Sequence, residues 1–331
     1  MPLHPGTEPA AIAAAADQLV AGGLVAFPTE TVYGLGARAD DDAAVAGIFA
    51  AKGRPADHPL IVHLADAAQA GQFAAELSPL AQRLMQAFWP GPLTIIVPRR
   101  PERASAAAGG QASVGLRCPA HPVAHALLQA AAQRGVKGVA APSANRFGRV
   151  SPTTAQHVAD EFGPALMVLD GGACAVGIES SIVDCTRGHA VLLRPGVLTR
   201  AQIEAVLGEP LHDRDAQAPR ASGTLEAHYA PNARVRLMAG AELADALDAL
   251  AGENGAVHTL AVYSRTVRPS GPTGTVMHRW MPHSAAQAAQ ELFSVLRDFD
   301  DRGAQLIWVE QPPDTPDWDG VRDRLQRAAA A

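Results

Sequence analysis

The feature that most constrains the fold is the alternation of short apolar runs with longer amphipathic stretches over the first two-thirds of the chain. The Ala-rich amphipathic stretch 9–21, for example, stops at Gly22-Gly23, and the apolar run 24–27 follows it. Short apolar runs bounded by Gly or Pro are typical of buried strands, and amphipathic stretches are typical of helices that cover a sheet. The pattern therefore predicts an α/β fold. We expect a mixed sheet, because some strands follow one another with no helix between them.

Two domains are expected from the way this pattern changes along the 331 residues. Residues 1–208 form the first domain. Residues 209–233 are rich in Pro, Gly and charge without apolar periodicity, which indicates a linker. Residues 234–331 return to the alternation and predict a smaller, Rossmann-like α/β domain. The predicted strands are 24–27, 60–64, 93–97, 113–116, 138–141, 166–169, 181–184, 191–193, 234–238, 257–263 and 305–310, and the predicted helices are 9–21, 42–51, 65–76, 79–88, 122–134, 153–162, 199–207, 241–251, 284–300 and 318–329.

The composition argues against several classes of protein. Three cysteines without a Cys-x-x-Cys pair indicate buried thiols rather than a disulfide framework or a four-cysteine zinc site. A net charge of −6 does not favour a nucleic-acid-binding surface, although a local basic cavity would not show in this sum. The longest apolar stretch, 10–27, is interrupted by polar residues and glycines, and the first residues lack the basic region of a secretory signal. We therefore expect a cytoplasmic protein without a membrane span.

Four loop segments place glycine and polar residues next to the ends of predicted elements, where ligands bind in open α/β sheets. They are PTETVYGLG (28–36), KGRPADHPL (52–60), APSANRFGRVSP (141–152) and GIESS (177–181). The first of them is equally consistent with a plain turn. In the third, Ser143, Asn145 and Ser151 could hydrogen-bond an anion or a ribose, and Ser151 could instead cap the helix that follows.

The segment KGRPADHPL is the most informative, because Lys52, Arg54 and His58 fall within seven residues. Only two of the 27 basic residues of the chain are lysine, and Lys52 is the one inside a motif. Arginine offers a bidentate fork and lysine a mobile point charge, a pair suited to phosphate groups. The alternative is a solvated basic turn. Arg117 and Arg194, each at the end of a predicted strand, would join this group only if the strand ends converge.

Several enzyme classes lack their signatures in this sequence. It contains no GxxxxGK[ST], no GxGxxG after a strand, no HExxH and no GxSxG. Cys118, His121 and His125 have a spacing that resembles a zinc site, but Pro119 and Pro122 disfavour helical backbone at the residues before them. No metal ligands are therefore assigned.

The motifs FPTETVYGLG, KGRPADHPLIVHL, FWPGPLTIIV, VGLRCP, APSANRFGRVSPT, GIESSIVD and LLRPG occur in the order found in the YrdC-like family. The chain resembles the long, two-domain threonylcarbamoyl-AMP synthases of that family. The resemblance covers about residues 8–208, and ASGTLEAHYAP with the tail resembles the family's linker and C-terminal domain. It implies an open, twisted, mixed sheet with flanking helices, a linker that acts as a lid over 209–233, and a C-terminal Rossmann-like domain over 234–331.

The resemblance also implies a reaction. L-threonine, bicarbonate and ATP would give L-threonylcarbamoyl-adenylate and pyrophosphate, with Mg²⁺ assisting. A downstream tRNA threonylcarbamoyl transferase complex would then modify the adenosine beside the anticodon, and a contact with tRNA itself is compatible with this role. A nucleotidyl transfer needs positioning and charge neutralisation rather than a protein nucleophile, so the motifs fit it.

Site residues follow from the resemblance position by position. Lys52 and Arg54 would be catalytic, nearest the phosphates. One departure concerns His58, where family members often have Asn; an imidazole can replace an amide as donor or acceptor. The L-threonine pocket would comprise Thr31, His63, Arg117, Ala141 and Ser181. The ATP side would comprise Lys52, Arg54, His58, Ser113, Ser143, Asn145, Ser151, Arg194 and Tyr229.

Two other functions remain as alternatives. An RNA-binding module would grip a nucleic-acid backbone, but the negative net charge and the lack of interleaved aromatic and basic residues count against it. A carbamoyl-adenylate enzyme of the hydrogenase-maturation type would need acylphosphatase and zinc-finger segments that the sequence lacks.

Overall fold

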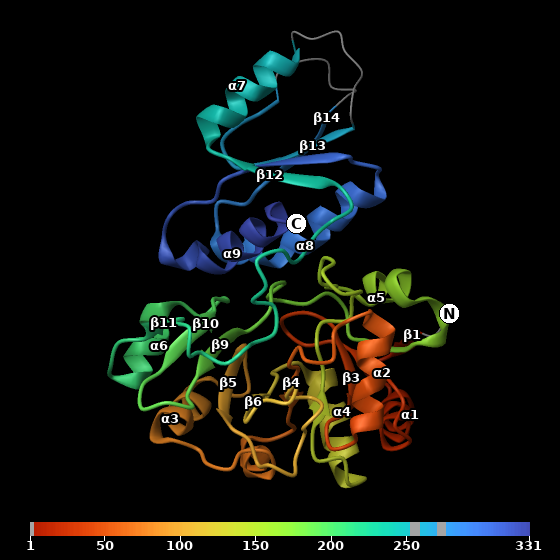
Figure 1. Ribbon diagram of the computed structural model, residues 1–331. Coiled ribbons are helices and arrows are strands. Elements are labelled where there is room, and N and C mark those ends of the chain that lie inside the picture. The colour runs from red at the N-terminus through yellow and green to blue at the C-terminus, as the bar shows by residue number, and fades with distance from the viewer. Residues whose placement is uncertain (1–2, 252–258, 270–275) are drawn as a thin grey trace. The chain divides into compact units, whose positions relative to one another are not determined.

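A computed structural model describes residues 3–251, 259–269 and 276–331, which form two compact units (Figure 1). The first unit comprises Met1–Phe147 and Ser151–Thr224. The second comprises Gly148–Val150 and Leu225–Ala331. The predicted linker 209–233 is thus divided between the units at Thr224.

The described elements of the first unit are short strands and longer helices in alternation. Its strands are β1 (Leu3–Pro5), β2 (Val25–Phe27), β3 (Gly34–Arg38), β4 (Ile61–His63), β5 (Leu93–Pro98), β6 (Ser113–Arg117), β7 (Val139–Ala140), β8 (Met167–Asp170), β9 (Ser181–Asp184), β10 (Val191–Arg194) and β11 (His212–Asp213). Its α-helices are α1 (Pro9–Val20), α2 (Asp42–Lys52), α3 (Pro79–Phe88), α4 (Pro122–Gln133), α5 (Ala155–Phe162) and α6 (Arg200–Leu207). Two short 3₁₀ helices are η1 (Ala67–Gln72) and η2 (Gly163–Ala165).

Among the described residues these strands form one 11-stranded sheet in the order β1-β8-β2-β3-β7-β4-β6-β5-β9-β10-β11. Parallel and antiparallel neighbours lie side by side: β4 is parallel to β6 and antiparallel to β7. The predicted mixed sheet is therefore confirmed.

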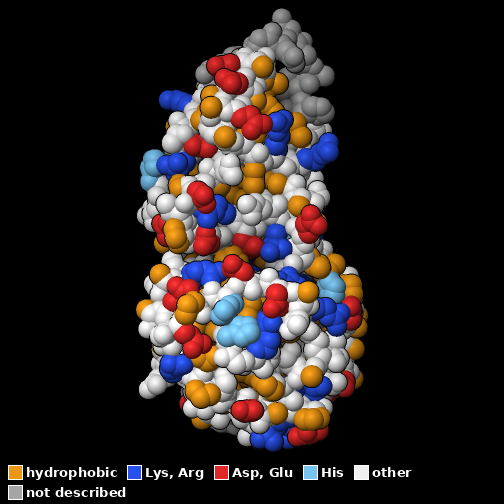
Figure 2. Space-filling model, turned by 60° about the vertical axis from the view of Figure 1, so that its left-hand side comes forward, with side chains coloured by type: hydrophobic (Ala, Val, Ile, Leu, Met, Phe, Trp, Pro, Cys, Tyr) orange, Lys and Arg blue, Asp and Glu red, His pale blue; other side chains and the backbone are white. Residues whose placement is uncertain are grey.

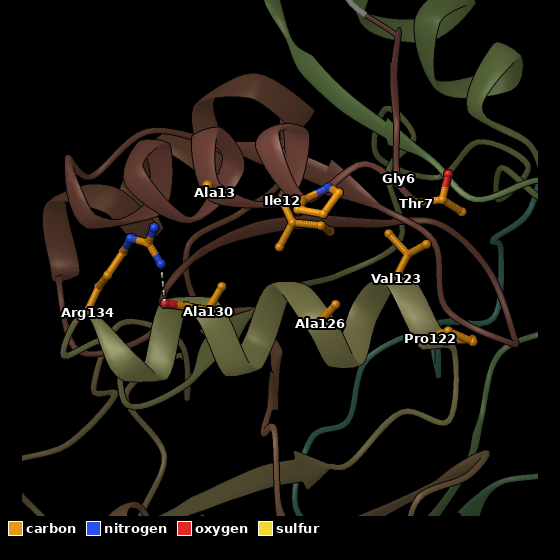
Figure 3. A pocket seen from close by; sticks show the side chains of 10 residues that line it. Gly6, Thr7, Ile12, Ala13, Pro122, Val123, Ala126, Ala130 and Arg134 are labelled. Atoms are coloured by element: carbon orange, nitrogen blue, oxygen red, sulfur yellow. Dashed lines mark hydrogen bonds between the residues drawn. The ribbon is translucent and has the colours of Figure 1, made fainter.

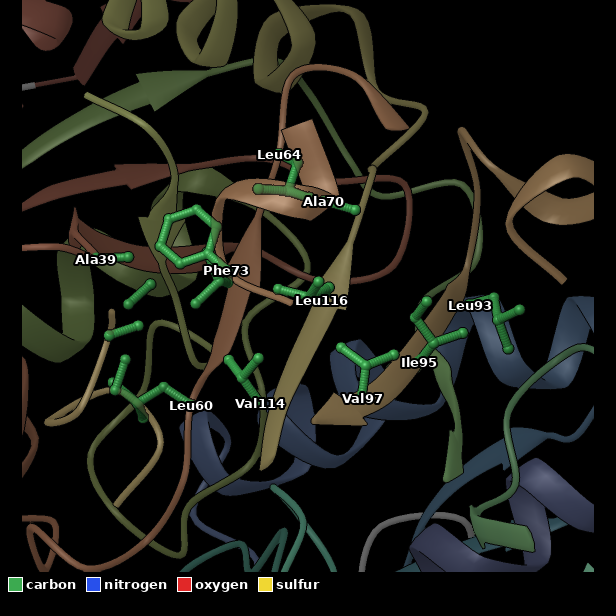
Figure 4. Packing of buried hydrophobic residues seen from close by; sticks show 14 of the residues in the cluster. Ala39, Leu60, Leu64, Ala70, Phe73, Leu93, Ile95, Val97, Val114 and Leu116 are labelled. Atoms are coloured by element: carbon green, nitrogen blue, oxygen red, sulfur yellow. The ribbon is translucent and has the colours of Figure 1, made fainter. Parts of the chain in front are cut away.

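Helices cover both faces of this sheet, and β2 shows which helix lies where. Alternate residues of a strand point to opposite faces. Val25 and Phe27 belong to an apolar cluster with α1 and α4, which pack against each other, whereas Ala26 belongs to a larger cluster with α2, α3, α5 and α6. In Figure 4 the side chains of Val97 and Leu116 lie on one face of β5 and β6, within the larger cluster. Burial of one such side chain stabilises the fold by about 1.5–3 kcal/mol.

A third apolar cluster explains where the first unit ends. Ile61, Ile96 and Ile182 point away from the larger cluster, and Ala218 and Ala221 pack against them. Part of the predicted linker, at Ala218 and Ala221, therefore covers an apolar part of the sheet, because these isoleucines would otherwise face water.

The second unit is a small, fully parallel α/β domain in the described residues. Its sheet has the order β12-β15-β13-β14, and every neighbouring pair is parallel. The Rossmann-like prediction is confirmed in class, and the strand β14 was not predicted. The first two residues of the predicted strand 257–263 lie outside the described residues. The elements are β12 (Arg234–Met238), β13 (Leu260–Ser264), β14 (Val276–Trp280), β15 (Leu306–Glu310), α7 (Gly240–Ala251), α8 (Ala285–Asp301), η3 (Pro316–Trp318) and α9 (Asp319–Ala329).

None of the helices in the described ranges is long and apolar enough to cross a lipid bilayer.

Candidate active site

The residues predicted to form the L-threonine pocket come from strand ends that the sheet brings to one edge. Parallel pairing of β4 with β6 places His63 beside Arg117. Antiparallel pairing of β5 with β6 brings the start of β5 to that edge, and parallel pairing of β9 with β5 places Ser181 beside Leu93. Strand register alone therefore gathers three of the five predicted residues.

Arg117 is the centre of this edge. Its side chain is 4% exposed and forms an ion pair with Glu30, with 2.6 Å between Nη2 and Oε1. Its Nη1 donates to Thr31 Oγ1 at 2.8 Å and its Nε donates to Gly91 O at 3.2 Å. These bonds use three of the five N–H donors of a guanidinium, so two donors remain for a carboxylate ligand.

Glu30 was not among the predicted site residues. Its second oxygen, Oε2, accepts from the Ala120 amide at 3.2 Å, so the carboxylate joins the PTETVYGLG loop to the segment that follows β6. The motif contained Glu30, but only the folded chain shows that its partner is 87 residues away.

His63 is buried and neutral. Burial, followed by the charge of Arg117, lowers the pKa of His63 to about 3. Nδ1 lies 3.2 Å from Ile61 O, and a carbonyl oxygen can only accept, so Nδ1 carries the proton in this bond. The ring also packs edge-on against Phe27 at 6.0 Å between centroids. A neutral imidazole beside Arg117 adds no second positive charge to the pocket.

Ala141 and Ser181, which are also predicted in the L-threonine pocket, are held by contacts with backbone atoms. The Ala141 amide donates to Ile61 O at 2.9 Å, which places Ala141 next to β4. Ser181 is fully buried, and its Oγ donates to Leu198 O at 3.4 Å. Gly196 of the LLRPG motif allows this approach, because a Cβ there would lie 2.5 Å from the Ser181 nitrogen.

Lys52 lies at the last turn of α2 and organises the APSANRFGRVSP loop. Its Nζ donates to Ser143 O at 2.6 Å and also to Asn145 O. The residue is 2% exposed; burial lowers the pKa of Lys52 well below its usual value, and the charge of Arg54 acts in the same direction. When protonated, the ammonium has three N–H donors, of which these bonds use two.

Arg54 and His58 contact the same loop at Phe147. Phe147 lies 5.8 Å from the Arg54 guanidinium and 5.3 Å from the His58 ring. Burial, followed by the charge of Arg54, lowers the pKa of His58. The KGRPADHPL and APSANRFGRVSP motifs are therefore in contact in the structure.

Arg194 joins this group through Ser222, a residue that the sequence did not single out. The Arg194 Nη1 donates to Ser222 O at 2.8 Å, and the Arg54 Nη2 lies 3.5 Å from Ser222 Oγ. Arg194 also donates from Nε and Nη2 to Ser180 O, at 3.1 and 2.9 Å. Both arginines therefore converge on one segment of the predicted lid.

Ser151 binds a buried acidic residue and does not cap a helix. Its Oγ donates to Glu179 Oε1 at 2.5 Å. The cap of α5 is Thr154, which accepts from the His157 amide at 3.2 Å, so the capping alternative for Ser151 is wrong. Glu179 of the GIESS motif is a second residue that sequence reasoning missed.

The last two predicted ATP-side residues belong to different units. Ser113 begins β6, about 13 Å along the strand from Arg117, and lies next to the loop that ends at Leu60. Tyr229 belongs to the second unit, where it is 1% exposed and its ring stacks on Phe293 at 5.4 Å between centroids. Its assignment to the nucleotide stays a prediction.

The zinc-like spacing at Cys118 does not form a metal site in the described residues, where no group of three or more His, Cys, Asp or Glu could hold an ion. His121 Nδ1 accepts from the Val123 amide at 3.2 Å as the cap of α4. Burial raises the pKa of Cys118 to about 11. The three cysteines are buried free thiols, as predicted.

The surface of the first unit has a groove between α1 and α4, shown in Figure 3. It has a volume of about 430 Å³, and residues such as Ile12, Val123 and Ala126 line it. It shares no residue with the predicted site. On the face shown in Figure 2, acidic and basic side chains are intermixed within each unit instead of forming one large basic field.

Comparison with known proteins decides the family. The Sua5/YciO/YrdC family profile, whose description is "Telomere recombination", matches residues 17–196. A second profile, described as "Threonylcarbamoyl-AMP synthase, C-terminal domain", matches residues 198–330. The chain belongs to the Sua5/YciO/YrdC family.

Members of this family match the chain along nearly its whole length. The threonylcarbamoyl-AMP synthase of Pyrococcus abyssi is 37% identical and aligns with 93% of this chain and 91% of its own length. That of Bacillus subtilis is 37% identical, with 96% and 92% aligned. The structure of P. abyssi Sua5 complexed with L-threonine is similar with a TM-score of 0.85 at 36% identity, covering 96% of this chain and 94% of that one.

Proposed function

We propose that this chain makes L-threonylcarbamoyl-adenylate from L-threonine, bicarbonate and ATP and releases pyrophosphate. One observation carries the proposal: Arg117, held by Glu30 and Thr31, has two N–H donors left at the edge where β4 and β6 end. That is the arrangement an amino-acid carboxylate requires. The relatives named threonylcarbamoyl-AMP synthase and the threonine complex of P. abyssi Sua5 support it over almost the full chain.

The reaction divides into two balanced steps. The threonine amine attacks the carbon of bicarbonate, forms a C–N bond and loses water, which gives a carbamate. A carbamate oxygen then attacks the α-phosphorus of ATP, and the bond from that phosphorus to the β-phosphate oxygen breaks. Pyrophosphate leaves with the electron pair. No protein nucleophile is needed, so the residues act by binding and charge neutralisation.

The residues of the first unit divide this work between two groups. Arg117 would bind the threonine carboxylate, and neutral His63 and Ser181 would line the same pocket. Lys52 and Arg54 would neutralise the phosphates, with Arg194 beside them. In the structure, Lys52 also holds the Ser143 and Asn145 carbonyls, so one side chain would both shape the loop and present its remaining N–H to a phosphate.

Mg²⁺ would arrive with ATP. The side chains predicted on the ATP side carry guanidinium, ammonium, imidazole, amide and hydroxyl groups, and the described residues contain no group of three or more His, Cys, Asp or Glu that could hold a cation. These groups fit an ion that is held mainly by substrate phosphates and water. Mg²⁺ supplies charge neutralisation at the phosphates.

Further parts of the proposal concern the setting of the reaction. The product would pass to a tRNA threonylcarbamoyl transferase complex in the cytoplasm, which would modify the adenosine beside the anticodon. Within residues 218–224, Ser222 contacts both Arg54 and Arg194. These contacts support the idea that the predicted lid acts at the nucleotide.

The deciding experiment measures pyrophosphate release by the full chain with ATP and Mg²⁺, omitting threonine or bicarbonate in turn and testing serine in place of threonine. We expect release to require both substrates and mass spectrometry to detect the threonylcarbamoyl-adenylate. Release that is indifferent to both would contradict the proposal. Salt-dependent tRNA binding without turnover would favour an RNA-binding module instead.

A further inference from the structure

Thr29 of the PTETVYGLG loop is a buried threonine beside the candidate site. Its exposed fraction is 2%, and that of Thr31 is 0%. Thr29 Oγ1 lies 2.6 Å from Val32 O and 2.8 Å from Thr31 Oγ1. It also accepts from the amides of Thr31 and Val32, each at 3.2 Å. One hydroxyl therefore contacts polar atoms of both residues that follow Glu30.

These contacts assign the protons of the two hydroxyl groups. A carbonyl oxygen can only accept, so the contact with Val32 O takes the single proton of Thr29. The proton between the two hydroxyl oxygens must then come from Thr31. Thr31 therefore donates to Thr29 and has no proton left for a ligand.

Thr31 Oγ1 keeps one lone pair. A hydroxyl oxygen has two, and Arg117 Nη1 donates to one of them at 2.8 Å. Within residues 3–251, 259–269 and 276–331, Thr29 and Arg117 are the hydrogen-bond partners of this oxygen. Toward a bound molecule, Thr31 can therefore only accept, and the ligand must place a donor opposite it.

Arg117 places this acceptor next to the position of a ligand carboxylate. Its Nη1 binds Thr31 and its Nη2 binds Glu30, so within the described chain each of these nitrogens keeps one N–H for a carboxylate. Glu30, ionised in its pair with Arg117, also presents acceptors only. A carboxylate on Arg117 therefore has acceptors on both sides, which favours a ligand that carries a cationic donor beside its carboxylate.

The α-ammonium of an amino acid meets this requirement. It has three N–H donors, and it is bonded to the same carbon as the carboxylate. The β-hydroxyl of L-threonine is a second donor, but it supplies one proton and lies one carbon further from the carboxylate. The α-ammonium is therefore the group that fits opposite Thr31.

The direction of the Thr31 hydroxyl depends on Thr29. Because Val32 O takes the proton of Thr29, the Thr29 oxygen can only accept from Thr31. Without the Thr29 hydroxyl, the proton of Thr31 loses this acceptor and can turn toward the ligand. Two donors cannot hydrogen-bond to each other, so a proton of Thr31 that faces an ammonium weakens binding.

We propose that Thr29 is a positioning residue for L-threonine: it takes the proton of Thr31, so that Thr31 Oγ1 accepts a hydrogen bond from the α-ammonium of the substrate. This inference rests on the proposed function and deepens it, because it orients the substrate. The carboxylate lies on Arg117, and the nitrogen that becomes the carbamate lies beside Thr31. Thr29 itself does not touch the substrate.

The test compares Thr29→Val with Thr29→Ser in the full chain. Valine keeps the shape of threonine and removes the hydroxyl, whereas serine keeps the hydroxyl. Thr199→Val is the matched control, because Thr199 Oγ1 accepts from the Gln202 amide at 3.3 Å as the cap of α6, outside the candidate site. Both valine variants lose a hydroxyl that holds backbone, and circular dichroism checks that they fold.

We expect Thr29→Val to raise the KM for L-threonine by roughly 5- to 20-fold, with the KM for ATP within about 2-fold of the unmodified protein. Thr29→Ser should bring the KM for L-threonine back to within about 3-fold, and Thr199→Val should leave both KM values unchanged. A merely structural loss would lower the active fraction and hence kcat, without raising the KM for L-threonine.

Two unreactive analogues test the orientation itself as competitive inhibitors. L-α-aminobutyrate keeps the ammonium and lacks the hydroxyl, and β-hydroxybutyrate keeps the hydroxyl and lacks the ammonium. Thr29→Val should weaken inhibition by L-α-aminobutyrate by about the same factor as it raises the KM for L-threonine, and should change inhibition by β-hydroxybutyrate by less than about 2-fold. Equal weakening for both analogues would show a distorted loop and overturn the inference.

The same measurements separate this inference from the proposed function. If the unmodified protein releases pyrophosphate only with L-threonine and bicarbonate, and folded Thr29→Val has an unchanged KM for L-threonine, the inference alone is overturned. If the unmodified protein shows no dependence on L-threonine, the proposed function fails, and the positioning role of Thr29 fails with it.

Discussion

The two sheets of this protein use the edges where their parallel strands end in opposite ways. In the first unit, the edge where β4 and β6 end carries Arg117, with N–H donors to spare beside neutral His63. In the second unit, the edge where β13 and β15 end is closed by its own acidic side chain. Glu310 Oε2 accepts from the amides of Arg265 and Thr266 at 2.6 and 2.7 Å.

Successive backbone amides that point to one spot form an anion-binding concavity. The second unit has such a concavity after β13, where Val267 supplies a third amide at 3.3 Å, and it fills the concavity with Glu310. Burial raises the pKa of Glu310, but the hydrogen bonds from Thr266 and the neighbouring amides outweigh that effect and hold the pKa below its ordinary value. The same kind of sheet edge therefore keeps unused donors in one unit and is closed by a side chain in the other.

The largest change in activity is expected when the ammonium of Lys52 is removed. Lys52→Ala should lower pyrophosphate release by roughly 100-fold or more while the fold persists, because the loop carbonyls and the phosphates both lose a cationic donor. Circular dichroism checks the fold, Lys52→Met separates loss of charge from loss of volume, and Lys137→Ala at an exposed position is the control. Full turnover by Lys52→Ala would contradict the proposed role of Lys52 at the phosphates.

The next test uses the pH dependence of folding. His63 stays neutral in the fold down to about pH 3, whereas the unfolded chain binds a proton near its reference pKa of about 6.5. Its contribution to stability is complete above about pH 6.5 and falls by about 1.4 kcal/mol per pH unit as the pH drops toward 3. Between pH 6.5 and 5, urea unfolding should show a loss about 2 kcal/mol larger for the unmodified protein than for His63→Gln.

Exposed His283 in the second unit provides the control for this measurement. His283→Gln should lose as much stability on acidification as the unmodified protein. Identical pH profiles for all three proteins would contradict a neutral, buried His63.

The smallest expected effect concerns the closed edge. Glu310→Gln replaces one carboxylate oxygen by an amide that cannot accept, so the second unit should lose about 1 kcal/mol of unfolding free energy. Pyrophosphate release should stay within about 2-fold of the unmodified rate. Glu242→Gln breaks an exposed ion pair with Arg236 and should change stability by less. A large loss of activity in Glu310→Gln alone would mean that the second edge takes part in catalysis.

Local pattern was sufficient to predict the elements that carry much of the site. The apolar runs that become β4 and β6 ended at or next to His63 and Arg117, and the family motifs named both residues. The glycine-rich motif hid β3, which was expected to be loop. Position 36 of that strand is a glycine because a Cβ there would lie 2.8 Å from the ring of Phe27. Only the pairing of β3 with β2 brings Phe27 this close.

Contacts over long sequence distances could not be predicted. Glu30, Glu179 and Ser222 owe their roles to partners that lie far away in the chain, and no local spacing signals them. The predicted helix 65–76 fails for a related reason. Only the 3₁₀ helix Ala67–Gln72 forms, and Phe73 and Ala74 that follow it are buried in the core of the first unit. Tertiary packing overrode a weak local preference there.

The burial of Lys52 has a practical consequence for labelling. The chain has two lysines, and the other, Lys137, lies exposed at the start of the segment that leads into β7. An amine-reactive reagent that modifies lysine side chains in the folded protein will therefore attach at Lys137. A fluorophore or a surface tether can be placed at one defined side chain while the loop held by Lys52 stays unmodified.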